Sequence, residues 1–408
     1  MASAPTSTPE APPPPPQQTL PLIRLAEAPL DPPPQFAALR RDNPVTPVGI
    51  WDGTGRAWLV TRWEDARALL RNPALSAEMG RPGFPLTRPG VPPPPYGFFQ
   101  GHDDPVHTTF RKALTREFTM RRIEAMREPT VRITDRLLTA MISQGGPADF
   151  VTALALPLPS LVICELLGVP YADHDFFQQH SSVLVDFRST GAEIVAARAA
   201  LGDYLERLVD VRRREPRGDL LSTLGEHVEA GTFSLRDAAD LGAFLLFAGH
   251  ETTANMIGLS VLALLAHPDQ IGRIHDPAAA PTAVEELLRY LTIVQSGLRR
   301  IAVEDITVGG ELIRAGDGVI ISLNAANRDG DAFADPDRLD LQRADARRHV
   351  AFGYGVHQCL GQPLARLELT IVLPAVFRRL PGLAVDLSEV VFKDTAFAYG
   401  PRAMPVTW

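Results

Sequence analysis

One cysteine stands in a glycine-punctuated loop near the C-terminus. The loop, residues 352–361, reads Phe-Gly-Tyr-Gly-Val-His-Gln-Cys-Leu-Gly, and a helical pattern follows it. Gly353 and Gly355 allow backbone conformations closed to other residues, and Gly361 leaves room for a flat ligand beside the first helical turn. Because a thiolate binds metal and is stabilised by N–H groups at a helix start, we expect Cys359 to bind iron.

The spacing Phe-Gly-x-Gly-x-His-x-Cys-x-Gly resembles the haem-binding signature of the cytochromes P-450, the haem-thiolate monooxygenases. The resemblance covers the chain from about residue 33 to its end. It implies a mainly α fold with a smaller β region, and haem b held by Cys359 between Phe352 and Gly361. The alternative for Cys359 is a buried structural cysteine, the role that we assign to Cys164 in the apolar run 161–167.

A second reactive group lies within a long apolar segment that begins after Ser234. Its residues 248–253 read Ala-Gly-His-Glu-Thr-Thr and resemble the oxygen-binding segment of the same family. Thr252 can bond back to the carbonyl of Ala248, which beside a glycine loosens a helix and opens a groove for dioxygen. The resemblance implies that Glu251 and Thr252 direct protons to oxygen. The alternative is a tolerated polar kink in a core helix.

Four cationic side chains match the family's donors to the haem propionates. His107 and Arg111 lie one helical turn apart, and Arg300 and His357 complete the set by the same matching. Each alone would be a solvated charge, whereas a convergent set would form charge-assisted hydrogen bonds to two carboxylates. Arg299 is an open alternative to Arg300.

A carboxylate and a guanidinium, Glu286 and Arg289, are three positions apart and share one helix face. Alone, such a pair is an ordinary surface salt bridge. The resemblance implies a structural pair completed by a third arginine, which we expect to be Arg338. These three residues should brace the haem-side fold without taking part in catalysis.

An apolar substrate chamber should lie opposite the thiolate. Ala248 and Thr252 share a helix face with Phe244 one turn earlier, so this stripe should face the site of oxygen activation. The proline-rich stretch 81–101 should also face the substrate, unless it is a solvated linker. The expected lining residues, for which ordinary core packing is the alternative, are Phe84, Phe98, Leu184, Phe244, Val294 and Phe397.

The elements that must position these groups are mostly helices. We expect a strand at 58–61, a helix at 63–70, a helix at 131–142, and one unusually long helix that runs from the capping box at Ser234 to residue 267. A charged residue at its centre would cost about 2.5–3.5 kcal/mol in a membrane, so we expect no membrane span. Short strands should follow at 297–303, 306–308, 311–313 and 319–323.

The composition of the 408 residues is that of an ordinary globular protein, 45% hydrophobic and 22% charged. Residues 1–20 should be a disordered proline-rich tail, and residues 21–408 one haem-binding domain. The net charge of −8 argues against nucleic-acid binding. Two cysteines assigned to different roles leave no disulfide framework, which indicates the cytoplasm.

The resemblance implies an enzyme that inserts one oxygen atom of O2 into a mid-sized hydrophobic substrate by hydroxylation or epoxidation. It most resembles soluble bacterial enzymes of secondary metabolism, such as compactin and vitamin D hydroxylases. The expected role is therefore in secondary-metabolite biosynthesis or in xenobiotic conversion. The alternatives are a peroxide-using haem enzyme and a non-catalytic haem sensor.

The sequence contains no glycine-rich strand-loop-helix unit for a nicotinamide or flavin. Electrons that come ultimately from NAD(P)H should therefore arrive through a ferredoxin and a ferredoxin reductase. A basic docking patch for an acidic ferredoxin is expected near Cys359, unless its members are scattered surface charges; its members would be Arg116, Arg121, Arg122, Arg343, Arg347 and Arg348.

Overall fold

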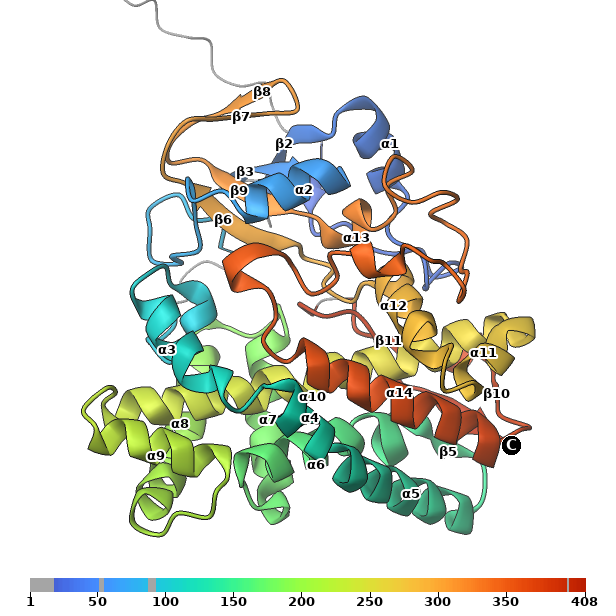
Figure 1. The fold of residues 1–408 in the computed structure, drawn as a ribbon. Helices are drawn as coiled ribbons and strands as arrows, with labels where there is room; N and C mark the ends of the chain where they lie inside the picture. Colours follow the sequence, from blue (N-terminus) through green and yellow to red (C-terminus); the bar gives the residue numbers. More distant parts are fainter. Residues whose placement is uncertain (1–17, 51–54, 87–92, 395) are drawn as a thin grey trace, which may run out of the picture.

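The computed structural model describes residues 18–50, 55–86, 93–394 and 396–408, and helices dominate it (Figure 1). The α-helices are α1 (Gln35–Asp42), α2 (Trp63–Leu70), α3 (Val106–Thr115), α4 (Met120–Ala125), α5 (Arg127–Gln144), α6 (Pro157–Leu167), α7 (His174–Val185), α8 (Gly191–Arg214), α9 (Leu220–Glu229), α10 (Leu235–Ala266), α11 (Ile271–His275), α12 (Ala280–Leu291), α13 (Leu323–Ala326) and α14 (Gln362–Arg379).

The strands lie mainly in one mixed sheet with the order β1-β2-β3-β9-β6-β4. Strand β3 pairs with β9 in parallel, and β6 pairs with β9 in antiparallel register, with Arg300 opposite Val319. The strands are β1 (Thr19–Leu20), β2 (Val45–Ile50), β3 (Gly55–Val60), β4 (Leu75–Ser76), β5 (Ala148–Asp149), β6 (Leu298–Ala302), β7 (Ile306–Val308), β8 (Glu311–Ile313), β9 (Gly318–Ile321), β10 (Ala384–Val385), β11 (Val391–Phe392), β12 (Pro401–Ala403) and β13 (Pro405–Thr407).

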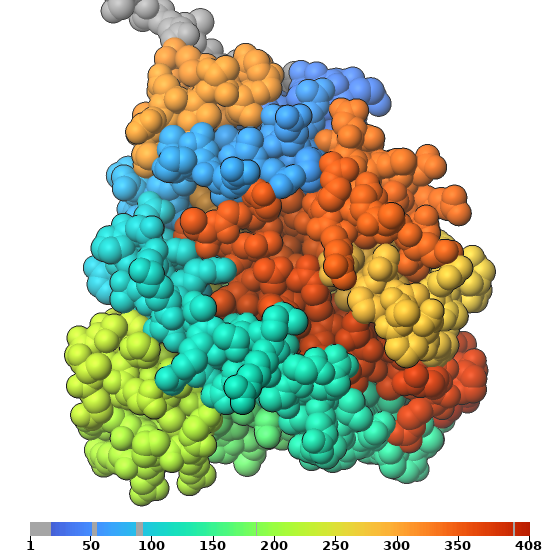
Figure 2. Space-filling model, in the orientation of Figure 1, coloured from blue at the N-terminus to red at the C-terminus, as the bar shows by residue number. Residues whose placement is uncertain are grey.

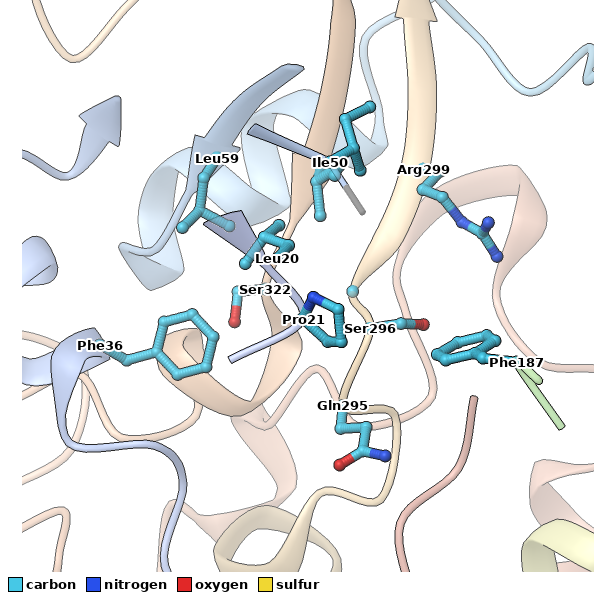
Figure 3. A pocket seen from close by; sticks show the side chains of 12 residues that line it. Leu20, Pro21, Phe36, Ile50, Leu59, Phe187, Gln295, Ser296, Arg299 and Ser322 are labelled. Carbon is cyan, nitrogen blue, oxygen red and sulfur yellow. The ribbon is translucent and has the colours of Figure 1, made fainter. Parts of the chain in front are cut away.

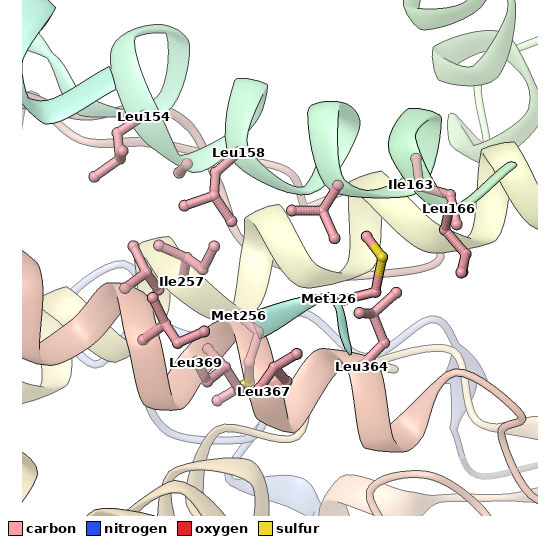
Figure 4. Packing of buried hydrophobic residues seen from close by; sticks show 14 of the residues in the cluster. Met126, Leu154, Leu158, Ile163, Leu166, Met256, Ile257, Leu364, Leu367 and Leu369 are labelled. Carbon is pink, nitrogen blue, oxygen red and sulfur yellow. The ribbon is translucent and has the colours of Figure 1, made fainter. Parts of the chain in front are cut away.

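The long helix α10 forms the centre of the helical part. Ser234 and Asp237 make the predicted capping box, in which each side chain bonds the other residue's backbone N–H. The helix lies between α6 and α14, and leucine, isoleucine and methionine side chains of the three helices pack together (Figure 4). Its 32 residues form one continuous helix, so the expected loosening near residue 248 interrupts no turn.

Most helices share one hydrophobic core, and two smaller clusters lie against the sheet. Cys164 is buried in the large core, and burial raises the pKa of its thiol to about 12. A thiol that resists ionisation is a poor metal ligand. The assignment of Cys164 to the core is therefore confirmed.

Several predicted elements are confirmed, although their boundaries differ: the helix expected at 131–142 is α5, and the strands expected at 297–303 and 319–323 are the shorter β6 and β9. The expected strand and helix near the N-terminus appear as β3 and α2, and the two short strands at 306–308 and 311–313 appear unchanged as β7 and β8. Leu323 begins helix α13 instead of ending a strand. Residues 1–17 of the predicted tail lie outside the described residues, but Thr19–Leu20 pair with β2. The conformation of such a two-residue strand depends on its pairing with β2, and two residues are too few to show a periodic pattern in the sequence.

Within the described ranges, no helix combines the length and the apolar character that crossing a bilayer requires.

Candidate active site

The cysteine loop has the backbone conformations that its glycines predicted. Gly353 and Gly355 have φ values of 71° and 75°, in the left-handed region that favours glycine. A Cβ atom at Gly355 would lie 2.4 Å from the carbonyl oxygen of Leu70, at the end of α2. The N–H of Cys359 donates to the carbonyl of Phe352 at 2.9 Å and closes the loop. Close contact with α2 therefore fixes the loop that carries the thiol.

The thiol of Cys359 lies among hydrogen-bond donors. Burial raises the pKa of the Cys359 thiol, while hydrogen bonds from the backbone N–H groups of Gly361 and Gln362 and the charge of Arg111 oppose that rise. A Cβ atom added to Gly361 would have only Cys359 Sγ within 4 Å, at 4.0 Å. Gly361 therefore leaves room on its side of the sulfur, and a coordinated metal would complete the stabilisation of a thiolate.

A buried network that the sequence analysis missed braces the same loop. Arg366 donates to Glu285 at 2.6 and 3.0 Å and stacks over the ring of Phe352 at 4.7 Å. His349 Nε2 lies 3.0 Å from Glu285, while its Nδ1 accepts a hydrogen bond from the N–H of Ala351. In this arrangement Nε2 is the nitrogen that donates, to the carboxylate of Glu285. Glu285 comes from α12, His349 from the segment just before the cysteine loop, and Arg366 from α14. Local sequence spacing does not reveal a contact among such distant segments.

The four predicted propionate donors meet in one cluster. The rings of His107 and His357 lie 4.1 Å apart, and Arg111 donates to the carbonyl of Gln358 at 2.8 Å. Arg300 is 8% exposed and lies close enough to both histidines to influence their pKa values. Among the described residues, His107 Nε2 and His357 Nδ1 are buried and have no hydrogen-bond partner.

The electrostatics of this cluster favour an anionic partner. Burial lowers the pKa of Arg300 to about 10, and burial together with the neighbouring cations lowers the pKa of His357 to about 3. Carboxylates placed there would offset the desolvation and mutual repulsion of these groups and would supply acceptors to the two buried nitrogens. Together with the room that Gly361 leaves beside Cys359, the residues present fit haem with its two propionates.

Arg299, the alternative to Arg300, faces a different part of the molecule. It lines a pocket together with Leu20 of β1, Phe36 of α1 and Gln295, which follows α12. The side chain of Arg299 extends toward Phe187 (Figure 3). Neighbouring residues of a strand point to opposite faces. The geometry therefore supports Arg300 as the propionate donor.

The oxygen-binding segment shows one predicted contact and one that was not predicted. Thr252 Oγ1 donates to the carbonyl of Ala248 at 2.9 Å. Glu251 forms a salt bridge with Lys393 at 2.5 Å, and the same ammonium group donates to Asn255 at 2.9 Å. Lys393 and Glu251 are 142 positions apart, which explains why sequence spacing did not indicate this contact.

The third member of the structural pair was assigned wrongly. Glu286 and Arg289 are fully buried and joined at 2.7 and 2.9 Å, as predicted. The arginine that completes the pair is Arg343, which donates to Glu286 at 3.1 Å. Arg338 contributes only its carbonyl oxygen, to Arg289 and Arg343, and its side chain is exposed. The turns that follow residue 328 place the guanidinium of Arg343 beside the buried carboxylate of Glu286.

The predicted chamber residues come together in part. Phe98 and Phe244 form a ring contact with centroids 5.2 Å apart. A β-bridge joins Val294 to Ala398, the neighbour of Phe397. Phe98, Leu184 and Phe244 all adjoin the large core. Phe84 belongs to none of the three hydrophobic clusters.

The proline-rich stretch contacts two separate places. Gly83 lies against Gly316 at the sheet, whereas a Cβ atom at Gly97 would lie 2.4 Å from the backbone nitrogen of Leu241 in α10. Residues 87–92 of this stretch lie outside the described residues. The end of the stretch therefore reaches the long helix, and its beginning lies beside the sheet.

The predicted docking patch has to be revised. Arg343 is buried against Glu286 and cannot face a partner. Arg116 and Arg122 both pair with the buried Glu117, and Arg348 pairs with Asp345. Arg121 and Arg347 are exposed. Neighbouring acidic residues compensate several of the charges that the sequence presented as a cluster.

Comparisons with known proteins agree with this geometry. The cytochrome P450 family model matches residues 280–397. Cytochrome P450 CYP105Q4 of Mycobacterium marinum is 49% identical over 397 residues, which cover 95% of each chain. Pentalenic acid synthase of Streptomyces avermitilis is 47% identical and covers 93% of this chain and 95% of its own. The crystal structure of CYP105P1 in complex with filipin I has a TM-score of 0.88 and 39% identity, over 96% of this chain and 98% of that one.

Proposed function

This chain belongs to the cytochrome P450 family of haem-thiolate monooxygenases, which use dioxygen, and from that premise we propose the roles of its own residues. Cys359 would ligate the haem iron. His107, Arg111, Arg300 and His357 would hold the propionates. The observation that carries the proposal is the convergence of these four side chains, with two unpartnered nitrogens, beside the cysteine loop.

When bound, haem supplies the activation of dioxygen, so that one oxygen atom enters the substrate and the other is reduced to water. The chain must bring protons to that place and keep bulk water out. Thr252 has a hydroxyl that can exchange its bond to the carbonyl of Ala248 for one toward the haem side. Glu251 precedes Thr252 in the helix, and its side chain is 14% exposed. Its carboxylate can therefore pass protons between solvent and Thr252.

We assign the substrate to the class of mid-sized hydrophobic metabolites. The ring contact of Phe98 with Phe244 and the placement of Val294 next to the strand-like segment at residue 397 support an apolar wall. The relative named pentalenic acid synthase and the structure solved with filipin I support a role in secondary metabolism. Hydroxylation or epoxidation is the expected reaction.

We further propose that a ferredoxin and its reductase pass electrons from NAD(P)H to this protein, in the cytoplasm. The absence of a nucleotide-binding glycine motif from the sequence supports an external electron source. An acidic ferredoxin would meet the exposed Arg121 and Arg347 near the cysteine loop.

A Thr252→Ala variant tests the proposed proton path. It should bind haem and substrate but release more peroxide and less product for each NAD(P)H consumed, because the hydroxyl that directs protonation is lost. The measurement is the ratio of product to NAD(P)H with a ferredoxin and reductase. Thr252→Ser should retain the ratio, as should Thr253→Ala, which alters the neighbouring buried hydroxyl.

Equal product yield per electron in Thr252→Ala and wild type would remove Thr252 from the mechanism. Product formation with peroxide alone, at the rate reached with the redox partners, would favour the peroxide-using alternative. Failure to form product with any member of a broad panel of hydrophobic metabolites would favour a non-catalytic haem sensor.

A further inference from the structure

One of the two lysines of the chain makes a contact with the acid of α10 that the roles above do not use. Lys393 Nζ lies 2.5 Å from Glu251 Oε1 and 2.9 Å from Asn255 Oδ1. The side chains of Lys393 and Glu251 are only 13% and 14% exposed. An ion pair that is so little exposed is screened less than a surface pair, so its two charges interact more than those of an exposed pair.

The turn that carries Lys393 is anchored to its surroundings by several bonds. The N–H of Lys393 donates to the carbonyl of Gly400 at 2.9 Å, and Asn255 Nδ2 donates to the carbonyl of Ala398 at 3.3 Å. A Cβ atom at Gly400 would lie 2.5 Å from Asn255, so the turn packs directly on α10. Gln295 donates to three carbonyls of the turn, including that of Lys393. The turn from which the ammonium group reaches Glu251 is therefore held against α10.

A fixed cation has two effects on a neighbouring carboxylate. It favours the charged form over the neutral acid, and it directs the carboxylate toward itself by a charge-assisted hydrogen bond. For Glu251 both effects act against uptake of a proton. A proton relay through Glu251 therefore requires this pair to loosen during each turnover.

We propose that Lys393 is a positioning residue for oxygen activation, which keeps Glu251 charged and directed toward the C-terminal turn until a proton is delivered. This inference rests on the proposed role of Glu251 in the relay. It adds a residue outside α10 to the control of proton transfer.

Other titratable groups near the pair do not replace this role. His250 is buried, and burial lowers its pKa, while Glu251 raises it and Lys393 lowers it to a smaller extent. Its Nδ1 donates to the carbonyl of Leu246, so this nitrogen is already engaged. Asp394, beside Lys393, is exposed. On the outer side of the turn, Asp186 pairs with Arg188.

Infrared spectroscopy of the ferric, substrate-free protein tests the charge of Glu251 directly. In a pH titration, the carboxylic acid C=O band of Glu251 should appear at a higher pH in Lys393→Met than in wild type. Lys393→Arg should match wild type in this titration. The double variant Lys393→Met with Glu251→Gln should lack the band, which distinguishes it from the band of the buried Glu368, whose pKa burial raises. No difference between Lys393→Met and wild type would overturn the inference, and Lys393→Gln serves if the methionine variant does not fold.

The pH dependence of coupling gives a second readout. The ratio of product to NAD(P)H should change with pH around a midpoint that Lys393→Met raises by about one pH unit or more, because an opposite charge within 4–6 Å has been removed. Lys393→Arg should keep the wild-type midpoint. Lys112→Met, which removes the other lysine from exposed surface of α3, should also keep it. An unchanged midpoint in Lys393→Met would contradict the proposal.

Glu251→Gln separates this inference from the function on which it rests. If Glu251→Gln couples electrons to product as wild type does, the proposed relay itself is wrong. If Glu251→Gln loses coupling while Lys393→Met matches wild type in both readouts, the relay stands and the role of Lys393 is wrong.

Discussion

Glu285 illustrates how single residues outside the reactive groups hold this site in place. Burial alone would raise the pKa of its carboxyl, but hydrogen bonds from His349 and Arg366 outweigh that effect and lower the pKa to about 2. The carboxylate thereby connects α12 to the residues on both sides of the cysteine loop. Its side chain is 6% exposed, so solvent screens these contacts little.

Glu285→Gln should lower the free energy of unfolding by about 1–3 kcal/mol at neutral pH, because charge-assisted hydrogen bonds are lost in a buried place. Since the folded-state pKa is depressed, the stabilisation is present above about pH 4.5 and is lost as the pH falls toward 2. Denaturant unfolding at several pH values measures both effects. The matched control Glu226→Gln removes an exposed partner of Arg116 and should cost at most about 1 kcal/mol.

A difference between wild type and Glu285→Gln that stays constant from pH 7 to pH 3 would show that the charge of Glu285 does not stabilise the fold.

The site residues that could be predicted are those whose role depends on residues only a few positions away in the sequence. Cys359 follows two glycines whose positive φ values are predictable from the loop sequence, and Thr252 is four positions from the carbonyl that it bonds. Lys393 and Arg343 were missed or misassigned because their partners lie 142 and 57 positions away. Such contacts depend on how elements pack, and a nearby arginine such as Arg338 fits the sequence pattern equally well.

At the scale of elements, α10 forms part of the large hydrophobic core and also carries Glu251 and Thr252 of the candidate site. Its capping box and apolar residues explain its start and its burial, and both were predictable from periodicity. Its neighbours were not predictable, because an apolar helix is compatible with many partners. The contact of Phe244 with Phe98 connects this helix to the end of the proline-rich stretch.

Phe244→Trp and Val294→Trp should each weaken substrate binding or change the position of oxidation, because added bulk would enter the proposed chamber. Overpacking costs about 1–3 kcal/mol, so affinity should fall by about 5-fold to 150-fold. Spectral titration and product analysis measure these effects, and the carbon monoxide spectrum should stay as in wild type. The control Phe244→Leu, which removes bulk, should retain binding.

Unchanged affinity and an unchanged product pattern in both tryptophan variants would place Phe244 and Val294 in ordinary core packing.

At the scale of the whole molecule, the cysteine loop reaches one exposed face. Figure 2 shows the orange-red segment that contains the loop, flanked by α2 in blue and by α3 and α4 in cyan. Val356 in the loop and Met120 in α4 are exposed apolar residues, at 66% and 71%. Exposed apolar side chains near basic ones are typical of a transient docking surface.

Arg121→Glu and Arg347→Glu should each slow reduction by an acidic ferredoxin, and the wild-type rate should fall as salt increases, because electrostatic steering is screened. Stopped-flow reduction under carbon monoxide measures the rate. Arg207→Glu in α8 makes the same charge change on a helix that the docking proposal does not include, and it should leave the rate unchanged. A rate that responds to neither salt nor the two reversals would exclude this docking face.

The central claim is that Cys359, and not the second cysteine, ligates the haem iron. The most direct measurement is the absorption spectrum of the reduced carbon monoxide complex in Cys359→His and Cys164→Ala. We predict that Cys164→Ala keeps the band characteristic of thiolate-ligated haem, because Cys164 is buried in the core, and that Cys359→His loses this band. Retention of the wild-type band in Cys359→His would contradict the account.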